Sequence, residues 1–504
     1  MVLAFAAWQR ATLSGRSGWL LLAGAWVAVG FQAKMLQAWL IVPALPVGTL
    51  VAGRGLLRHR ILQVLVVGTV IVLLSISWMT AIQLIPAGVR PYIDGSTNDN
   101  IFSMVFGYNG VDRLLPGLVP GAVPQLGSGS GQSAAPLISA TRTADASSSI
   151  LKLVLPEITT QIGWLYPAAL TGIALRVAAF FRRPRPLHGR ARFDAGMTSS
   201  LATWLGVTGL VLSAAFVPHA TYFAVIALPL ALLAVVCAVD TIRWYLNRET
   251  GLKGVALPLL IAAQTAWQTL ILLVGPGQTQ WLAPVLAVLG LIGVTILLVS
   301  RGRMLPGRVA VAAVVVAALA APTLWSSSVL LPGGGGSASD AYAGPRLDVR
   351  ARPSASHAPG AVAAAPLRPI TAIRPPFQVP SDLRLTADQA VLVHYLVEHN
   401  GGRKTLFATD TLAVAVSVIL ATPHDVLAMG GFSRQAPTID ASGIRSLVDR
   451  GSLRFVLLSD PTPSSSNMAI VGVRQWVRAA CAPVMSGHYR EGAAVRLTLY
   501  DCRP

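Results

Sequence analysis

The chain has 504 residues, of which 54% are hydrophobic and only 12% are charged, and its mean hydropathy is +0.62. Soluble domains carry roughly 25% charged residues, so this composition excludes an ordinary soluble protein and predicts a membrane protein. The formal charge of +19 does not indicate nucleic-acid binding, because the basic residues stand in short clusters between apolar runs, as topology signals do.

Nine apolar segments approach the roughly 20 residues that cross a bilayer. We therefore predict a polytopic α-helical membrane protein with about nine spans, at residues 18–33, 35–52, 61–85, 162–181, 201–217, 221–239, 255–274, 281–299 and 309–331. The first two are separated only by Lys34 and its polar neighbour Gln32. Residues 1–8 read as the tail of a helix whose beginning is missing.

Charge fixes the expected orientation. Arginine clusters follow the segments that end near residues 52, 181, 239 and 299, and they alternate with connections that are mixed or nearly uncharged. Placing the basic clusters in the cytoplasm agrees at every connection. The outer loop 86–161 and the C-terminal region then face outward, which predicts a multi-pass plasma-membrane protein with an extracytoplasmic C-terminal domain.

Composition also divides the chain. Residues 1–331 form the membrane region, and within its outer loop residues 121–149 are rich in Gly, Ser, Ala and Pro and read as flexible. Residues 332–380 read as a disordered Gly-, Pro- and Ala-rich linker. Residues 381–504 alternate helical patterns (385–399, 411–420, 441–450, 468–480) with strand patterns (404–409, 426–429, 453–458, 495–500), which predicts a small α/β domain.

The polar loop, residues 90–113, departs sharply from the apolar run before it. Asp94, Asn98 and Asn100 are followed by an aromatic, Gly-rich stretch that holds Tyr108 and Asn109. Such a segment cannot lie in lipid and must leave the bilayer or line a wet cavity. Its amides, hydroxyls and rings suit a sugar ligand. Alternatively, its Asx residues bond their own backbone and merely cap the loop, and both interpretations stay open.

The carboxylates of Asp94, Asp99 and Asp112 allow several chemistries: orienting a sugar, holding a divalent cation through oxygen ligands, or acting as a base. Their spacing matches no metal signature, which favours solvated loop residues. No metal site is therefore predicted, although a divalent cation stays possible as a cofactor.

Three further residues lie at the expected outer ends of spans. His219 and Tyr222, in the sequence VPHATYF, either line a functional cavity or anchor the chain at the interface. Lys34 either meets a lipid phosphate as a point charge or only snorkels.

In the C-terminal region, Gly430 and Gly431 lie near Asp410, Ser433 and Asp440 and form either a ligand rim or ordinary turns and caps, of which the second is favoured. Cys481 and Cys502 can pair if this region faces an oxidising compartment. The sequence contains no nucleophile–base constellation, Walker loop or zinc spacing there.

Several motifs together point to a family. The polar loop (RPYIDGSTNDNIFSMVFGYNGVDRL), the segment GFQAKMLQAWLIVPAL and PHATYF resemble actinobacterial family 39 glycosyltransferases, polytopic GT-C enzymes related to protein mannosyltransferases and to ArnT, the aminoarabinose transferase of lipid A. The pieces TLFATD, VLAMGGF, LRFVLLSD and YDC resemble the C-terminal domain of YkcA/YkcB-type proteins.

The resemblance implies a GT-C-like helical bundle and an inverting transferase. A sugar on a polyprenyl phosphate is delivered at the outer face, a cell-envelope lipid, glycan or protein hydroxyl attacks the anomeric carbon, and the prenyl phosphate leaves. Lys34 then steadies the phosphate, and Asp94, Asn98, Asn100, Tyr108, Asn109, His219 and Tyr222 line the cavity. Membrane lipids are expected partners, and nucleic acid is not.

One departure affects the catalytic base. The family's aspartate lies in a first outer loop upstream of the Gly-Phe…Lys segment, and this chain begins after it, so we expect an N-terminally truncated relative and name no base. The alternative function is a non-catalytic membrane-anchored protein that binds glycan or a partner. A transporter is disfavoured, because paired Gly/Pro-broken helices in two related halves are not seen.

Overall fold

The structure, a computed structural model, describes most of the chain as two compact units. Unit 1 comprises Met1–Ala81, Asp145–Gly336 and Asp340–Leu347, and unit 2 comprises Ile82–Ala144, Ser337–Ser339 and Asp348–Pro504. The described residues are 1–87, 89–123, 151–182, 188–215, 220–275, 280–299, 304–330, 343–344, 385, 387–431, 433, 436–459, 468–489 and 497–503. The predicted linker 332–380 apart from Ala343 and Gly344, most of the predicted flexible stretch 121–149, and His219 therefore lie outside the described residues.

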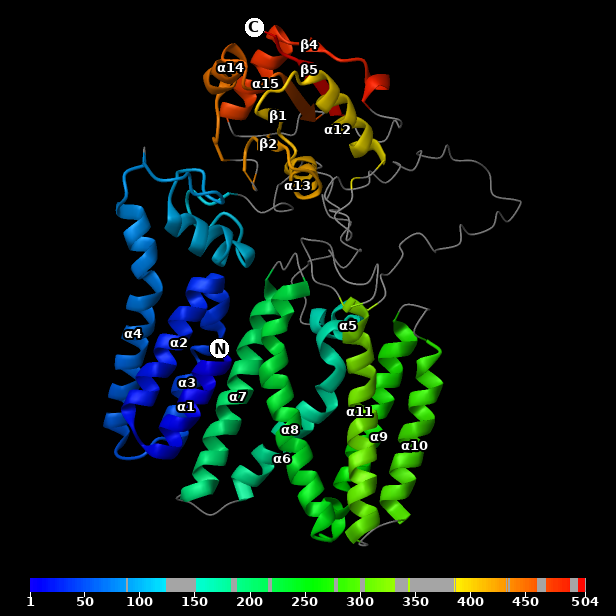
Figure 1. Cartoon of the computed structure of the whole chain (residues 1–504). Helices are drawn as coiled ribbons and strands as arrows, with labels where there is room; N and C mark the ends of the chain where they lie inside the picture. The colour runs from blue at the N-terminus through cyan, green and yellow to red at the C-terminus, as the bar shows by residue number, and fades with distance from the viewer. Residues whose placement is uncertain are drawn as a thin grey trace, which may run out of the picture. The chain divides into compact units, whose positions relative to one another are not determined.

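Unit 1 is helical (Figure 1). Seven helical segments among the described residues are long and apolar enough to cross a membrane: Ser17–Ile41, Leu57–Leu84, Ile158–Arg182, Gly189–Ala214, Ala224–Leu246, Gly251–Val274 and Leu282–Val299. The prediction of a polytopic helical membrane protein is confirmed. The elements are α1 (Val2–Ser14), α2 (Ser17–Lys34), η1 (Met35–Ile41), α3 (Ala44–Ala52), α4 (Leu57–Leu84), η5 (Lys152–Val154), α5 (Pro156–Ile162), η6 (Gly163–Leu165), α6 (Tyr166–Arg182), α7 (Gly189–Ala214), η7 (Ala220–Phe223), α8 (Ala224–Leu246), α9 (Gly251–Val274), α10 (Leu282–Val299), α11 (Met304–Ser327) and η9 (Ser328–Leu330).

The second predicted span, residues 35–52, is not one helix. α2 ends at Lys34, and Met35 has a φ of 50°, which breaks the α-helical path. The 3₁₀ helix η1 follows, and after Pro43 comes the nine-residue helix α3. Nine helical residues rise only about 14 Å, which is too short for the roughly 30 Å of a bilayer core. α3 instead packs against α7 inside unit 1.

The core of unit 1 holds large aromatic side chains that are fully buried, among them Trp8, Phe31 and Trp204. The Trp8 indole donates to Thr49 Oγ1 at 3.1 Å, which satisfies a polar atom that would otherwise be costly to bury. Outward-facing leucines and valines, such as Leu65 and Leu73 on α4, are exposed. This distribution fits helices that face lipid on one side and each other on the opposite side.

The C-terminal part of unit 2 is a five-stranded sheet with strand order β2-β1-β3-β5-β4. β1, β2 and β3 run parallel, whereas β5 is antiparallel to β3 and β4. The strands are β1 (Thr405–Thr409), β2 (Asp425–Ala428), β3 (Phe455–Ser459), β4 (Ala482–Pro483) and β5 (Leu497–Asp501), and the helices are α12 (Ala387–His399), α13 (Leu412–Ala421), α14 (Ala441–Asp449), α15 (Met468–Ala480) and the short η11 (Ser486–His488).

Two hydrophobic layers cover this sheet. Phe455 and Leu457 of β3 pack in the layer that includes α12 and α13, whereas Val456 and Leu458 pack in the layer that includes α14 and α15. This alternation follows from the two-residue period of a strand that is buried on both faces. The predicted α/β domain is thus confirmed, with element boundaries within two residues of the sequence patterns. Cys481 and Cys502 form a disulfide that joins the end of α15 to the end of β5.

The polar loop belongs to the N-terminal part of unit 2. It contains the π-helical segment η2 (Ser103–Tyr108) and the 3₁₀ turn η3 (Val111–Arg113). An isolated bridge between Ser96 and Ala122 closes the loop on itself.

Candidate functional site

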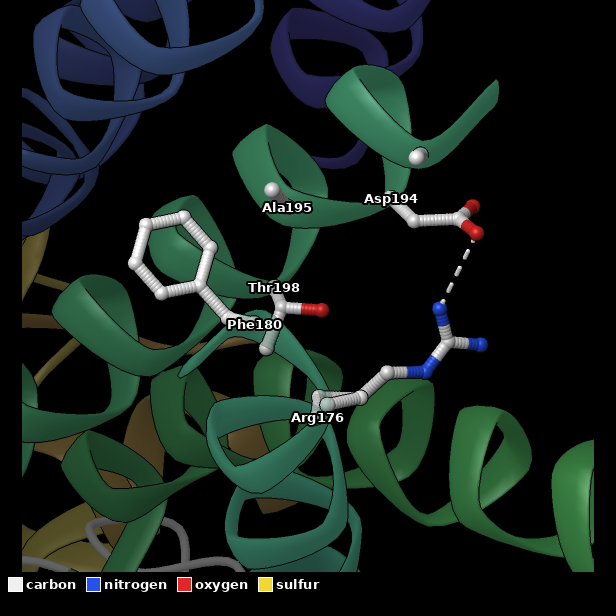
Figure 2. Close-up of a pocket in the computed structure, with 7 residues that line it drawn as sticks. Arg176, Phe180, Asp194, Ala195 and Thr198 are labelled. Atoms are coloured by element: carbon white, nitrogen blue, oxygen red, sulfur yellow. Dashed lines mark ion pairs between the residues drawn. The ribbon is translucent and has the colours of Figure 1, made fainter. Parts of the chain in front are cut away.

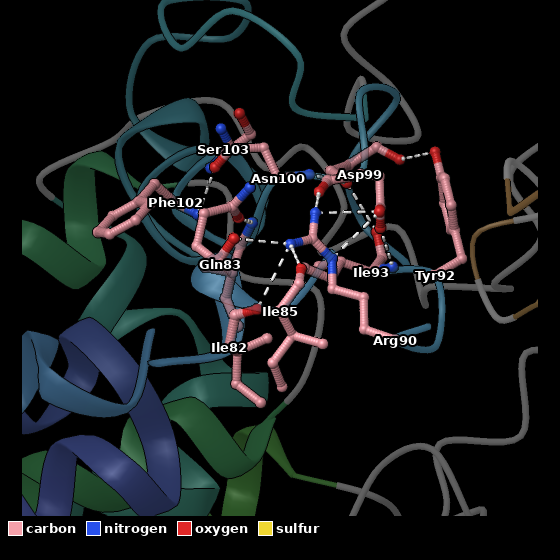
Figure 3. A network of polar contacts seen from close by, with 12 residues as sticks. Ile82, Gln83, Ile85, Arg90, Tyr92, Ile93, Asp99, Asn100, Phe102 and Ser103 are labelled. Carbon is pink, nitrogen blue, oxygen red and sulfur yellow. Dashed lines mark hydrogen bonds and ion pairs between the residues drawn. The ribbon is translucent and has the colours of Figure 1, made fainter. Parts of the chain in front are cut away.

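Arg90 organises the start of the polar loop (Figure 3). Its guanidinium donates to the carbonyl oxygens of Gln83 at 3.0 Å and Ile85 at 2.9 Å, which caps the end of α4. It also forms an ion pair with Asp99, whose Oδ2 lies 3.0 Å from Nη2. The Arg90 side chain is only 6% exposed. This arginine therefore joins the helix end to the loop through a nearly buried, charge-assisted network.

The acidic and amide side chains of the loop mainly bond loop backbone. Asp99 Oδ1 accepts from the Ile93 amide at 2.8 Å, and Asn100 Oδ1 accepts from the Phe102 amide at 2.8 Å. The buried Asp112 accepts from the Val119 amide at 3.0 Å. These contacts match the capped-loop interpretation for all three residues.

Asn98, Tyr108 and Asn109 also pack within the loop. A side chain at Gly121, where φ is 78°, would collide with the Asn98 amide, so Asn98 lies directly on the backbone there. Asn109 Oδ1 lies 3.4 Å from Arg113 Nη2, and the Arg113 guanidinium lies 6.0 Å from the centre of the Tyr108 ring. The structure thus brings the predicted loop residues together, as parts of one folded loop.

Asp94 contacts the C-terminal domain, within the same unit. Its carboxylate accepts from the Ser433 amide at 3.1 and 3.3 Å and from its neighbour Gly95 at 2.7 Å. Ser433 belongs to the turn that follows β2, and it is 339 residues away in sequence. Gly431 in that turn has a φ of 64°, and an added Cβ would lie 2.5 Å from Asp94 Oδ2. The turn glycine therefore leaves the space that the carboxylate occupies.

In unit 1, Lys34 and Tyr222 meet although they are far apart in sequence. The ammonium of Lys34 lies 4.9 Å from the centre of the Tyr222 ring, a distance at which a cation–π interaction is favourable. Gln37 of η1 donates to the Tyr222 carbonyl at 3.0 Å and holds the two segments together. Lys34 itself is exposed, and no carboxylate pairs with it among the described residues. This places an available positive charge at the end of α2.

The sequence reasoning missed Lys152. It is 6% exposed, and its ammonium donates to the carbonyls of Leu212 at 3.3 Å and Ala215 at 2.5 Å, at the end of α7. Burial lowers the pKa of Lys152, because the charged form loses its hydration. Within the described residues no carboxylate neutralises it. Its sequence context, a short apolar piece before Pro156, gave no signal of this role.

A second missed feature is a small pocket lined by Arg176, Phe180, Asp194 and Thr198 (Figure 2). Arg176 of α6 pairs with Asp194 of α7 at 3.3 Å and with Asp240 of α8 at 2.6 Å. Ionisable groups between membrane helices are costly unless they are paired, and here one arginine joins three helices. The geometry favours a structural clamp. Among the described residues, no group of three or more His, Cys, Asp or Glu side chains is arranged to hold a metal ion.

Comparison with known proteins gives the chain a family context. Residues 392–480 match the family model "Putative mannosyltransferase YkcB-like, C-terminal". The chain is 25% identical to "Putative mannosyltransferase YycA" of Bacillus subtilis strain 168, with 95% of this chain and 74% of that protein covered. It is 26% identical to "Putative mannosyltransferase YkcB" of the same organism, with 93% and 70% covered. These matches show that the chain is similar to YkcB-like putative mannosyltransferases over most of its length. No solved structure matches the chain significantly.

The YkcB-like resemblance of the C-terminal region is thereby confirmed. The match to both relatives extends through the membrane helices, so the similarity is not limited to the α/β domain. The comparisons support a glycosyltransferase, and the apolar helices support a membrane-embedded one.

Proposed function

We propose that this protein transfers a mannosyl or related sugar from a polyprenyl-phosphate donor to a cell-envelope acceptor at the outer face of the plasma membrane. The observation that carries the proposal is the Lys34–Tyr222 pair. An exposed ammonium at the end of α2, within the candidate span Ser17–Ile41, offers a positive charge that a lipid-linked phosphate could contact. Mannose is proposed as the sugar because both relatives are named putative mannosyltransferases.

In the proposed reaction, the acceptor hydroxyl attacks the anomeric carbon while the bond from that carbon to the phosphate oxygen breaks. The hydroxyl proton passes to a base, the prenyl phosphate leaves with the bonding electrons, and the anomeric configuration inverts. Lys34 stabilises the charge that grows on the departing phosphate. No residue of this chain is proposed as the base.

The polar loop has a different proposed role. Because Asp99, Asn100 and Asp112 bond loop backbone, the loop is held rigid, and its ring and amide groups, including Tyr108 and Asn109, are proposed to contact a sugar. His219 lies outside the described residues, and for it a contact with the sugar is proposed from the sequence alone.

The test measures sugar transfer in membranes that contain the full chain, supplied with a radiolabelled polyprenyl-phosphate mannose. Lys34→Gln should lower kcat/KM for the donor by about tenfold to a hundredfold, because one charge-assisted contact to the phosphate is lost. Lys34→Arg should restore much of it. Lys253→Gln is the matched control, since Lys253 also lies over an aromatic ring, that of Trp244, 5.8 Å away at the opposite end of α8.

Equal activity of Lys34→Gln and Lys253→Gln would contradict the proposed phosphate contact. Complete absence of transfer in the wild-type chain, with any lipid-linked sugar, would favour a binding protein instead.

A divalent cation is a further proposal. Treatment with EDTA should abolish transfer, and added Mg²⁺ or Mn²⁺ should restore it; unchanged activity after EDTA would exclude the requirement.

Orientation is tested separately. We propose that the polar loop and the C-terminal domain face outward, since the arginine clusters mark the cytoplasmic side. A membrane-impermeant thiol reagent added to intact cells should label Ser130→Cys and should not label Arg185→Cys. The reverse labelling pattern would overturn the orientation.

A further inference from the structure

The sheet of the C-terminal domain has a topological switch point at β1. From β1 the chain passes through α13 to β2 on one side, and it then returns through α14 to β3 on the other side of β1. All three strands are parallel, so their carboxyl ends meet at one edge. In open α/β sheets, ligands bind in the crevice that forms where the connections diverge in this way.

Polar side chains gather at that edge. Asp410 follows β1 directly, and Ser459 is the last residue of β3. The Asp410 carboxylate, which is buried, accepts from the Ser459 amide at 3.0 Å, from the Ser459 hydroxyl at 3.1 Å and from the Thr411 hydroxyl at 3.2 Å. The two strand ends are thus joined by one carboxylate.

Arg474 of α15 completes the cluster and leaves one donor unused. Its Nη2 pairs with Asp410 and donates to the Ser459 hydroxyl at 2.6 Å. Its Nη1 is buried and has no hydrogen-bond partner among the described residues, although Arg474 is only 5% exposed. A buried guanidinium nitrogen without an acceptor is costly, and native proteins rarely keep one unless water, an ion or a ligand supplies the acceptor.

Charge narrows the ligand class. The formal charges of Arg474 and Asp410 cancel, so the buried pair itself carries no net charge. The cluster offers one strong donor, Arg474 Nη1, beside the oxygens of Asp410 and Ser459. A hydroxyl group of a ligand can accept a hydrogen bond from the arginine and donate one to these oxygens. At the end of the neighbouring strand β2, the Gly430–Ser433 turn holds the Asp94 carboxylate of the polar loop. The same edge therefore meets the polar loop, within unit 2.

We propose that the carboxyl edge of this sheet binds a neutral glycan, with Arg474 Nη1 donating to a sugar oxygen and Asp410 and Ser459 fixing the arginine. The glycan corresponds to the acceptor, and in that respect the proposal rests on the proposed function. It adds a second binding site, in the C-terminal domain, to the donor contact at Lys34.

The experiment uses the full chain in nanodiscs, with α-linked mannotriose as the probe and saturation-transfer difference NMR to obtain the Kd. Arg474→Lys keeps the charge beside Asp410 but removes the second nitrogen, and it should weaken binding by about tenfold or more. Arg478→Lys, at an exposed position one turn further along the same helix, keeps its charge and should change the Kd by less than twofold. An equal Kd for the two variants would overturn the proposal.

Hydrogen exchange on the wild-type chain provides a second measurement that does not depend on a variant folding. Mannotriose should slow amide exchange at the carboxyl ends of β1 and β3 and leave β4 unchanged. Protection confined to unit 1, no binding at all, or binding of inorganic phosphate at this edge in place of mannotriose would each contradict a neutral-glycan site. Retained transfer without mannotriose binding would contradict this inference alone, whereas retained binding without transfer would contradict the proposed function alone.

Discussion

The polar loop and the Lys34–Tyr222 pair differ in what their polar groups do. The loop carries the more conspicuous sequence, yet Arg90, Asp99 and Asp112 use their charges to hold loop backbone in place. Lys34 stands in an apolar stretch, and among the described residues its charge lies over the face of the Tyr222 ring and pairs with no carboxylate. The polar residues of the loop thus mainly stabilise a segment that has little regular secondary structure. The exposed ammonium of Lys34, at the end of α2, is instead available to a ligand.

The largest expected effect comes from the loop. Arg90→Ala leaves Asp99 partly buried without its partner and uncaps α4, which should cost about 3–5 kcal/mol of unfolding free energy. Thermal unfolding and hydrogen exchange across residues 90–113 measure the loss. Thr97→Ala, at an exposed position of the same loop, is the control and should change little. A small effect of Arg90→Ala on the unfolding free energy would mean that the charges of the loop, like that of Lys34, are not needed for stability.

The attachment of the loop to the C-terminal domain should be weaker. Gly431→Ala introduces a Cβ that collides with the Asp94 carboxylate and strains a residue with a φ of 64°, at an expected cost of about 1–3 kcal/mol. Gly402→Ala tests the strain alone, because Gly402 also has a positive φ but has open space around it. Faster hydrogen exchange of the loop amides in Gly431→Ala but not in Gly402→Ala would show that the Asp94 contact holds the loop. Identical exchange in the two variants would contradict this role of Asp94.

The C-terminal domain contains a charge pair that resembles Arg90–Asp99 and can be tested by pH. Arg454 binds Asp501 with two contacts of 2.7 Å. Burial raises the pKa of Asp501, but the hydrogen bonds from Arg454 and Arg503 outweigh it and bring the pKa below its ordinary value. The carboxylate therefore stabilises the fold above its ordinary pKa near 3.9, and this stabilisation is lost as pH falls through the lowered value.

Asp501→Asn should accordingly lower stability by about 1–2 kcal/mol at pH 7. The difference from the wild type should shrink in acid and vanish once the wild-type carboxyl is protonated. Chemical denaturation at pH 7, 4 and 2.5 measures it. A difference that stays constant over this range would mean that the charge of Asp501 does not contribute.

The smallest expected effect on stability is that of Lys34. Because Lys34 is exposed and has no carboxylate partner among the described residues, Lys34→Gln should shift the unfolding free energy by less than about 0.5 kcal/mol. The same substitution is expected to reduce donor use strongly. A destabilisation as large as that of Arg90→Ala would assign Lys34 a structural role and remove the contrast between the two regions.

Sequence patterns of a few residues predicted the secondary structure of the C-terminal domain. The buried strands of the C-terminal domain and the helix α15 follow from short apolar runs and their stops, and the structure reproduces them. The boundary at Lys34 did follow from the sequence, but the division of residues 35–52 into the 3₁₀ helix η1 and the short helix α3 did not, because an apolar run of spanning length carries no mark of a positive φ at Met35.

The features that the sequence did not predict depend on contacts between segments that are distant in the chain. Nothing near Asp94 in the sequence indicates that it bonds the backbone at Ser433, and Arg474 has the spacing of an ordinary helix residue. Lys152 is buried in the folded chain, where its ammonium donates to carbonyls at the end of α7, about 60 residues away in sequence. Lys34 and Tyr222 were singled out separately, and only the folded chain brings them together.

The contact between Asp94 and Ser433 also has a consequence for biosynthesis. Ribosomes add about 5–20 residues per second, so the 339 residues between the two partners take on the order of tens of seconds to appear. During that time the helices of unit 1 can enter the membrane while the polar loop still lacks its final partner. The loop must therefore wait for its contact with Ser433 until the turn after β2 has been translated.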